Sequence, residues 1–369
     1  MKKTIICIST ILLSVLYVSC GKGERPEDTF SSDQIHVDFT RFEAEDRVNL
    51  SADGKELVGS PVEIVTTQDY IAILDMVKSP WIAIFDKKSM NFLGRIAPEG
   101  RGPGESINPG KLLPLDKGNT IWLFDGLMQR FQLFDIEVAL AAKAADTFYE
   151  PKRTFILIDS LRGSRDPSIT HTGLFATTTY SHDDCRYFYF DENPQIVQKV
   201  GLLPPPQQDW PKQGEKAYFP IGATYYNAKL AAHPKQDWVV VGYSNTDVIE
   251  IYKEGHLTQR VRGPEQIEIE KEIVEEVEGI YTSTTSEGTQ FTYLYLQAHG
   301  DYIFAAYQGR DSEQVLHFHI FDWDGKPVKR LAFDREVSAF WAEETSEDVF
   351  QAYVVDGEEG ILNKVELKI

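Results

Sequence analysis

Short apolar stretches that end in an aromatic residue followed by a charged residue recur along the chain. The copies span residues 82–86, 131–135, 187–191, 249–253 and 318–322. Their aromatic positions follow one another at intervals of roughly 50 to 70 residues, and repeats near this length built from short strands are typical of a β-propeller. The fourth copy departs from the pattern, because Lys253 stands where the other copies carry aspartate.

Further strands are predicted around these copies. They form antiparallel pairs over 62–65 with 70–74, 111–115 with 120–124, 155–158 with 174–178, 229–232 with 238–241, 293–297 with 302–306 and 337–341 with 349–355. The pairs are rich in β-branched and aromatic residues, and turn-forming residues bound them. The six pairs predict an all-β, six-bladed propeller over residues 33–369.

The first and last strands of this region suggest how the ring closes. The last unit has a third strand over 361–367 and then ends without an outer strand, whereas residues 35–39 form a strand with no unit of their own. Pairing the N-terminal strand with the last blade would close the ring and cover two open sheet edges. We therefore expect this pairing.

Two insertions interrupt the repeats. Residues 202–217 contain three consecutive prolines and are predicted to form an extended loop. Residues 266–279 are rich in glutamate. Part of this second insertion could form a short acidic helix. Ile267 and Ile269, however, alternate as in a strand, so both structures stay open.

The N-terminal residues have the pattern of an export signal. Two lysines precede an apolar run over 5–16, which is too short to span a bilayer comfortably, so a cleaved signal peptide is favoured. Cys20 follows this run and resembles the lipidated cysteine of a bacterial lipobox, although Tyr17 stands where leucine is usual. We expect a signal over 1–19 and a lipidated tether over 20–32, with an ordinary signal peptide as the alternative.

Cysteine content and charge narrow the class of protein. The chain has three cysteines, and with Cys7 removed and Cys20 lipidated only Cys185 would remain, so no intramolecular disulfide is expected. The formal net charge of −20 argues against nucleic acid and anionic lipid surfaces as partners. Beyond the signal no apolar run approaches 18 residues, so no transmembrane helix is predicted and only the N-terminal lipid would contact the membrane.

A glycine-rich segment follows the first blade. Residues 94–105 read Gly-Arg-Ile-Ala-Pro-Glu-Gly-Arg-Gly-Pro-Gly-Glu. A dinucleotide fingerprint needs a helix directly after it, but Pro109 and Gly110 break any helix here. The segment is therefore predicted to be a turn between blades, in which glycines supply positive φ angles and Pro103 stiffens the exit. A ligand contact through Arg101 or Glu105 is the alternative.

This loop carries a family resemblance. Together with Ile-Trp-Leu-Phe-Asp over 121–125 and Gln-Arg-Phe over 129–131, one blade in from a lipoprotein signal, it resembles the TolB-like six-bladed β-propeller lipoproteins of Gram-negative bacteria. The resemblance covers roughly residues 33–369. It implies a six-bladed fold and a location in the cell envelope. It implies no established activity, so it assigns no catalytic residue.

The geometry of a propeller blade places the candidate site. The loops between blades and between the second and third strands emerge on one face, and loops on one rim of a rigid scaffold often carry function. The polar candidates for ligand binding on this face are Arg101, Glu105, Asp125, Arg130, Tyr243, Tyr307 and Arg310. Turn formation is the alternative role for each of them.

Other polar groups give weaker indications of chemistry. His317 and His319 are predicted to share one face of a strand, but no third metal ligand is evident and an outward-facing strand explains them. The sequence Asp-Trp-Asp-Gly over 322–325 resembles the start of a calcium loop without its remaining ligands, so a hairpin turn is expected. No hydrolase, zinc-protease or paired-cysteine motif occurs.

Three functions remain open at this stage. The favoured one is a non-enzymatic envelope lipoprotein that binds a peptide, a glycan or a partner protein on the loop-rich face. It is expected in the outer membrane facing the periplasm, with exposure at the cell surface as the alternative. The alternative is a metal-dependent hydrolase or lactonase with calcium at the propeller axis. The third is a structural subunit of an envelope complex. A propeller fold alone cannot choose among them, because propellers serve all three functions.

Overall fold

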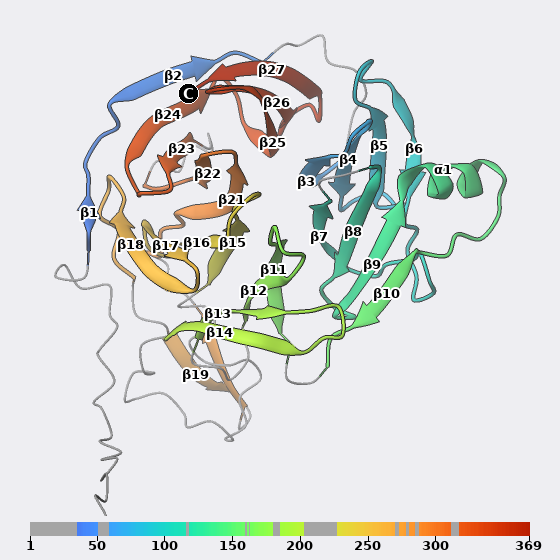
Figure 1. The fold of residues 1–369 in the computed structure, drawn as a ribbon, viewed down its shortest axis with the longest axis horizontal. Coiled ribbons are helices and arrows are strands. Elements are labelled where there is room, and N and C mark those ends of the chain that lie inside the picture. The colour runs from blue at the N-terminus through green and yellow to red at the C-terminus, as the bar shows by residue number, and fades with distance from the viewer. Residues whose placement is uncertain are drawn as a thin grey trace, which may run out of the picture.

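The computed structural model describes residues 35–369 except 51–58, 116–117, 159–160, 162, 180–184, 203–226, 270–272, 278–279, 285–287 and 311–316. Six sheets are arranged around a central axis, and one short helix lies outside them (Figure 1). The predicted all-β, six-bladed propeller is confirmed. The expected signal peptide, the tether and Cys20 lie outside the described residues.

The blades follow one another along the chain, and their core strands run antiparallel in sequence order. Blade one holds β3 (Pro61–Thr66), β4 (Tyr70–Asp75), β5 (Ile82–Asp86) and β6 (Phe92–Ile96). Blade two holds β7 (Pro109–Pro114), β8 (Thr120–Asp125), β9 (Arg130–Asp135) and β10 (Arg153–Ile156). Blade three holds β11 (Ser164–Ile169), β12 (Phe175–Thr179), β13 (Cys185–Phe190) and β14 (Ile196–Leu202).

The second half of the ring repeats this plan until the last blade. Blade four holds β15 (Ala228–Ala232), β16 (Trp238–Tyr243), β17 (Val248–Lys253) and β18 (His256–Arg262). Blade five holds β21 (Tyr293–His299), β22 (Tyr302–Tyr307), β23 (His317–Asp322) and β24 (Pro327–Phe333). Blade six holds β25 (Val337–Ser346), β26 (Val349–Asp356) and β27 (Leu362–Lys368).

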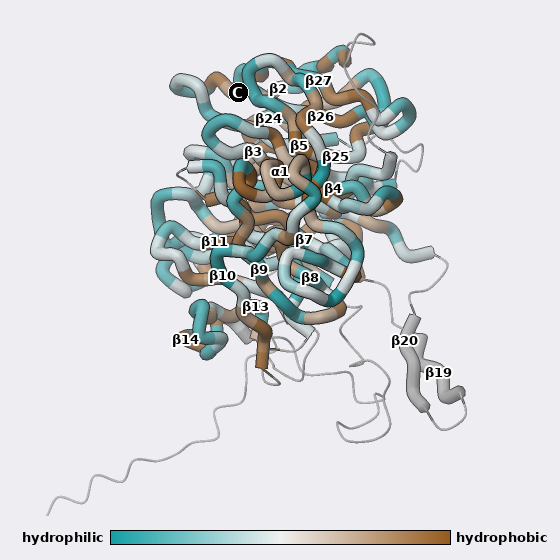
Figure 2. The backbone as a smooth tube through the Cα atoms, turned by 90° about the vertical axis from the view of Figure 1, so that its right-hand side faces the viewer, coloured by the Kyte–Doolittle hydropathy of each residue, from teal (hydrophilic) through white to brown (hydrophobic). Residues whose placement is uncertain are grey.

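The recurring apolar stretches form the third strand of blades one to five. Their aromatic residues are all buried, namely Phe85, Phe134, Phe190, Tyr252 and Phe321. Each of these aromatic side chains packs in an apolar cluster with residues of the preceding blade of the ring. Figure 2 shows the result from the side, with hydrophobic stretches inside the body and hydrophilic stretches along its margins.

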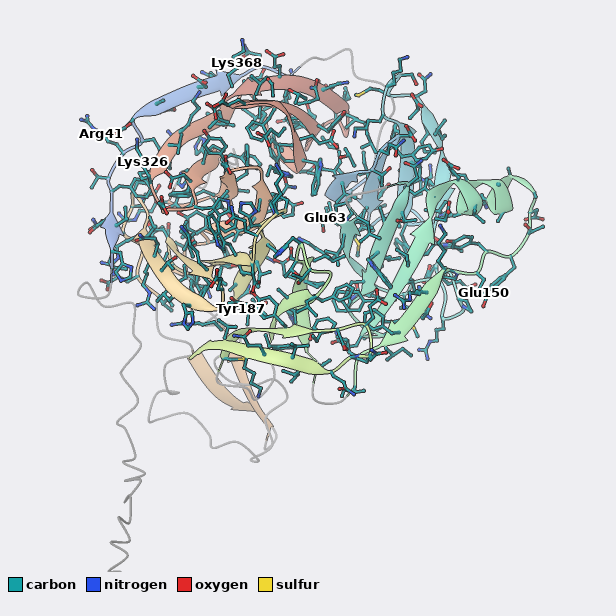
Figure 3. The ribbon with its side chains drawn as sticks, in the orientation of Figure 1. Arg41, Glu63, Glu150, Tyr187, Lys326 and Lys368 are labelled. Atoms are coloured by element: carbon teal, nitrogen blue, oxygen red, sulfur yellow. The ribbon has the colours of Figure 1, made fainter. Side chains whose placement is uncertain are left out.

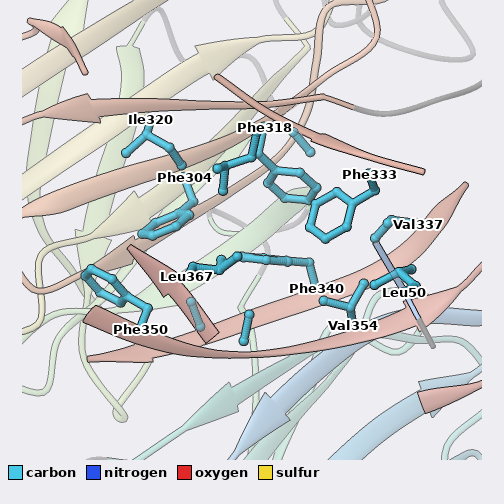
Figure 4. Close-up of a cluster of buried hydrophobic side chains, with 14 residues drawn as sticks. Leu50, Phe304, Phe318, Ile320, Phe333, Val337, Phe340, Phe350, Val354 and Leu367 are labelled. Atoms are coloured by element: carbon cyan, nitrogen blue, oxygen red, sulfur yellow. The ribbon is translucent and has the colours of Figure 1, made fainter. Parts of the chain in front are cut away.

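Aromatic clusters join neighbouring blades. Between blades five and six, the ring centroids of Phe318 and Phe340 lie 4.4 Å apart, and those of Phe304 and Phe350 lie 5.3 Å apart (Figure 4). Leu50, which precedes blade one, is buried in the same cluster. Apolar contact between blades thus extends to the N-terminal segment, and its burial stabilises the ring.

The N-terminal segment runs along the outer edges of two blades. β1 (Val37–Asp38) pairs in parallel with β18 of blade four, and β2 (Ala44–Val48) pairs in parallel with β24 of blade five. It is drawn in blue along the outside of the ring in Figure 1. This strand pairing is consistent with ring closure by the N-terminal segment, but the partner blade expected from the sequence was wrong. The last blade keeps three strands in the part of the chain that the structure describes.

Aromatic packing explains this choice of edge. The ring of Phe39 meets those of Phe42 and Phe321 edge-on, with centroids 4.9 and 5.8 Å apart. Phe321 belongs to blade five, so Phe39 is buried where blades four and five meet rather than beside blade six. Blades six and one close the ring by direct packing, in a cluster that includes Tyr353, Val355 and Ile64.

A helix that the sequence analysis did not anticipate changes the boundary between blades two and three. Helix α1 (Ile136–Ala144) directly follows β9, and Asp135 caps it by accepting a hydrogen bond from Val138 N at 3.1 Å. The strand expected over 155–158 to open blade three is instead β10, the outer strand of blade two. The inner strand of blade three is β11.

The structure describes little of the first insertion and most of the second. The predicted proline-rich loop over 202–217 lies outside the described residues from 203 onward. In the acidic insertion, which the sequence left open, β19 (Ile273–Val277) pairs antiparallel with β20 (Ile280–Thr284). Ile267 and Ile269, whose alternation suggested a strand, lie outside any strand. Within the described residues, no helix has the length and apolar character needed to cross a bilayer.

Candidate functional site

The glycine-rich loop between β6 and β7 folds around the side chain of Glu105. Gly102 N donates a hydrogen bond to Glu105 Oε2 at 2.7 Å. A Cβ atom on Gly100 would lie 2.1 Å from the same oxygen, and one on Gly104 would lie 2.7 Å from the carbonyl oxygen of Tyr149. Gly104 also has a φ of 73°, which favours glycine. The predicted turn between blades is confirmed. Glycine is needed at positions 100 and 104 because Glu105 and Tyr149 lie where a Cβ atom would be.

Arg130, at the start of β9 in blade two, holds this loop by hydrogen bonds to its backbone. Its buried guanidinium donates to the carbonyl oxygens of Arg101 at 2.9 Å, of Gly102 at 3.2 Å and of Glu105 at 2.5 Å. Gln132, two residues along the strand, donates to the Glu105 carbonyl at 2.7 Å and accepts from Gly104 N at 2.8 Å. These five hydrogen bonds hold the loop backbone against blade two.

Asp125 fixes the segment that follows the loop. Its carboxylate is fully buried and accepts hydrogen bonds from Ser106 Oγ at 2.7 Å, Ile107 N at 2.8 Å and Met128 N at 2.8 Å. Burial alone would raise the pKa of Asp125, but these donors outweigh it and hold the pKa below its usual value. Asp75 and Asp356 end the second strands of blades one and six and accept backbone N–H groups in the same way.

A cavity of about 160 Å³ lies between this loop, β6 and the segment that follows α1. We call it the rim cavity. Its apolar walls come from Ile96, Ala97, Phe134, Ala139, Phe148 and Tyr149. Arg95, Glu105 and Lys143 also line it. Phe148 is 66% exposed, so the cavity opens to solvent on this side.

Tyr149 holds the outer wall of the rim cavity in place. Its hydroxyl accepts a hydrogen bond from Asp135 N at 2.7 Å, and its ring stacks on Phe134 with centroids 5.3 Å apart. Burial raises the pKa of Tyr149 to about 12, so the phenol stays protonated at neutral pH. The wall is therefore attached to blade two through both the ring and the hydroxyl of Tyr149.

The structure brings four of the seven predicted site residues together. Arg101, Glu105, Asp125 and Arg130 all belong to the glycine-rich loop or to the contacts that fix it. Arg101 is exposed, Glu105 is half-buried, and the other two side chains are buried. The ligand-binding role of these residues stays a prediction. The contacts of Asp125 and Arg130 show that these two side chains hold the loop and the segment after it in place.

The other three predicted residues lie in blades four and five. Tyr243 is buried and donates its hydroxyl to Glu250 Oε2 at 2.7 Å. Tyr307 is also buried, and its ring stacks on that of His319 with centroids 4.2 Å apart. Arg310 is exposed, and its backbone N donates to the carboxylate of Glu265 at 2.7 Å. Among the described residues, no contact joins these three to the glycine-rich loop, and their ligand-binding role also stays a prediction.

The structure also shows where the residues with a weaker resemblance to metal ligands lie. His319 is buried against Tyr307 and Phe42 rather than facing outward. Asp322 accepts hydrogen bonds from Asp324 N and Lys326 N, both at 2.9 Å, so the predicted hairpin turn is confirmed. Across the described part of the chain, no group of three or more His, Cys, Asp or Glu side chains is arranged to hold a metal ion.

The sequence analysis missed a charged group at the propeller axis. Lys111 Nζ, on the inner strand of blade two, lies 3.2 Å from Glu63 Oε1 of blade one and 3.0 Å from Asp166 Oδ1 of blade three. Tyr295 of blade five donates its hydroxyl to Glu63 Oε1 at 3.0 Å. We call these four residues the axial cluster. Figure 3 labels Glu63, which lies toward the centre of the ring.

The charges of the axial cluster compensate one another. Burial raises the pKa of Glu63, and the charge of Lys111 opposes this rise only in part. Burial would lower the pKa of Lys111, but the carboxylates of Asp166 and Glu63 outweigh it and raise the pKa. The sequence does carry a signal for this group, because Glu63 and Lys111 interrupt otherwise apolar inner strands.

The profile of the TolB-like 6-blade propeller-like family matches residues 38–345 of the chain. The chain belongs to this family. No curated protein sequence matches this TolB-like propeller.

Solved structures resemble this TolB-like propeller at low sequence identity. A DUF4221 family member from Bacteroides vulgatus has a TM-score of 0.49 at 11% identity and covers 87% of this chain and 96% of its own. BamB from Moraxella catarrhalis has a TM-score of 0.38 at 12% identity, and the match covers 82% of this chain and 71% of BamB. The Cps50 (Swd1) β-propeller domain from Myceliophteria thermophila has a TM-score of 0.44 at 11% identity, over 85% and 98%.

Proposed function

We propose that this protein is a non-enzymatic binding protein of the cell envelope that holds a peptide, a glycan or a partner protein on its loop-rich face. The observation that carries the proposal is the rigid glycine-rich loop. Arg130 and Gln132 fix its backbone, Asp125 fixes the segment after it, and the rim cavity lies beside it. A loop that is already ordered loses little conformational entropy when a partner binds.

The axial cluster argues against the hydrolase alternative. A calcium ion at the axis would need several uncompensated carboxylates, but the Lys111 ammonium already lies between those of Glu63 and Asp166. A dication at that place would be repelled by the ammonium. Elemental analysis of the protein purified without chelator tests this alternative, since about one tightly held calcium or zinc per chain would revive it.

The proposed location rests on the sequence before residue 35. An apolar run followed by Cys20 supports export and lipidation, with the propeller held by its N-terminal lipid at the outer membrane and facing the periplasm. Incorporation of radiolabelled palmitate into the wild type, and its loss in Cys20→Ser, tests the lipid anchor. Equal labelling of both proteins would contradict it.

Site-specific photo-crosslinking in the envelope tests the binding function. A photoreactive residue is placed at Arg101, on the loop-rich face, or at Lys235, in the exposed turn between β15 and β16 on the opposite face. We expect a discrete adduct from position 101 and none from position 235, with the partner identified by mass spectrometry. Equal adducts at both positions, or none at position 101, would count against the proposal.

A further inference from the structure

The rim cavity has the size of one side chain. Its volume is about 160 Å³, and a cavity of about 150 Å³ with apolar walls is known to accept one benzene molecule. A single aromatic ring or a branched aliphatic side chain therefore fits, and a chain of sugar rings does not. Phe148 is exposed at its mouth and offers an apolar surface around the entrance.

The walls select an apolar group. Ile96, Ala97, Phe134 and Ala139 are buried and present no polar side-chain atom. The nearby Glu105 carboxylate already accepts a hydrogen bond from Gly102 N. A sugar or amide placed against these four side chains would leave polar groups without partners, at a cost in affinity. The chemistry of the cavity thus matches an aliphatic or aromatic side chain.

A free positive charge lies at the edge of the same cavity. Lys143, in the last turn of α1, is exposed and forms no ion pair with any described residue. Arg95, the other cation lining the cavity, is already paired with Asp75. The chain as a whole is acidic, so only a local cation can hold a carboxylate, and this unpaired ammonium favours partners that carry one beside the apolar group.

We infer that the rim cavity is an anchor pocket for a polypeptide partner that inserts one aromatic or branched aliphatic side chain and places a neighbouring carboxylate beside Lys143. The inference rests on the proposed binding function and names the partner class. An aromatic or aliphatic anchor in a pocket is a common centre of protein–protein interfaces. The apolar walls and the unpaired ammonium together select a polypeptide with an acidic residue next to its anchor.

Peptide selection tests this inference directly. A phage-displayed library of random peptides is panned against the full-length protein, and the enriched peptides are synthesised and titrated against the wild type and three variants. Ala139→Phe fills the cavity, Lys143→Glu reverses the charge at its edge, and Lys235→Glu makes the same charge change at the opposite face. Circular dichroism and thermal unfolding establish that each variant is folded.

We expect enriched peptides to carry Phe, Tyr, Trp, Leu or Ile next to Asp or Glu. Their affinity should fall at least about tenfold in Ala139→Phe, as for the loss of an interface anchor. It should also fall severalfold in Lys143→Glu and stay unchanged in Lys235→Glu. Because Lys143 is exposed, its variant tests the inference even where Ala139→Phe fails to fold.

Two results would overturn the inference. One is a set of enriched peptides that bind Ala139→Phe and Lys143→Glu as tightly as the wild type, and the other is the absence of any enriched peptide. If crosslinking at position 101 still captures a partner in either case, the proposed binding function stands and only the anchor pocket is rejected. If crosslinking fails as well, both are rejected.

Discussion

Lys111 Nζ lies 3.0 Å from Asp166 Oδ1, so a buried cation on the inner strand of blade two is paired with the inner strand of blade three. The same ammonium lies 3.2 Å from Glu63 Oε1 of blade one. Three consecutive blades therefore meet at one charge near the axis. Between blades five and six and between blades one and two, by contrast, apolar clusters join the neighbouring sheets.

Replacing the axial cation leaves the buried carboxylates of Glu63 and Asp166 without their ion-pair partner. In Lys111→Met, we expect the free energy of unfolding at pH 7 to fall by about 3–5 kcal/mol, the usual effect of removing one partner of a buried ion pair. Urea denaturation measures the change. The double variant Glu63→Gln, Lys111→Met should recover part of the loss, because one of the two unpaired charges is gone. A single variant as stable as the wild type would show that the pairing does not hold the blades.

The repeating strands could be predicted from the sequence because each carries a local pattern. The third strands were found because an apolar run that ends in an aromatic residue fits a buried strand with a hydrogen-bonded neighbour on each side. Helix α1 was missed because residues 136–144 show no apolar stripe at helical spacing. The edge to which residues 37–48 bind is set by the burial of Phe39 against Phe321, which are far apart in the chain.

The candidate site was predictable only in part. The glycine-rich loop stood out through its composition, and four of the predicted residues do lie in or under it. The axial cluster could not be assembled from the sequence, because Glu63, Lys111 and Asp166 meet only when the ring sets the position of its axis. The rim cavity depends on α1 and on Tyr149, whose contact with Gly104 no sequence pattern predicts.

The glycine-rich loop should not tolerate a side chain at position 100. In Gly100→Ala the new Cβ would lie 2.1 Å from Glu105 Oε2, so we expect a loss of about 1–3 kcal/mol in the free energy of unfolding, as for overpacking elsewhere. Gly110→Ala is the matched control, because its Cβ would lie 3.8 Å from the nearest atom. Urea denaturation compares the two variants.

The double variant Gly100→Ala, Glu105→Ala separates the clash from other effects of the substitution. Because the Glu105 carboxylate is what the new Cβ would meet, removing it should restore part of the lost stability. A loss that is the same with and without Glu105 would mean that the backbone at position 100, rather than the carboxylate, requires glycine.

The N-terminal segment should stabilise the ring through Phe39. This side chain is buried where blades four and five meet, so Phe39→Ala should lower the free energy of unfolding by about 3–5 kcal/mol, as for other buried phenylalanines. Phe148→Ala is the control, since Phe148 is 66% exposed and its loss should change stability little. Equal effects of the two substitutions would mean that burial of the N-terminal segment through Phe39 does not stabilise the ring.

A second buried charge lies between blades three and four, at Glu250. Its Oε1 accepts a hydrogen bond from Arg260 Nε at 2.8 Å and lies 2.7 Å from Nη2 of the same guanidinium, and its Oε2 accepts from the hydroxyls of Tyr243 and Tyr252. Burial alone would raise the pKa of Glu250, but Arg186 and Arg260 outweigh it and lower the pKa. The ionised form is therefore favoured in the folded state.

The effect of removing this charge should depend on pH. At pH 7, Glu250→Gln should lower the free energy of unfolding by about 3–5 kcal/mol, because buried guanidinium groups lose their counter-charge. A lowered folded-state pKa gives stability that is present above the unfolded pKa of about 4.3 and is lost as the pH falls through the folded value. The difference from the wild type should therefore shrink below that pH. Glu366→Gln, at an exposed pair with Lys368, should change little at any pH, and a pH-independent difference for Glu250→Gln would contradict this account.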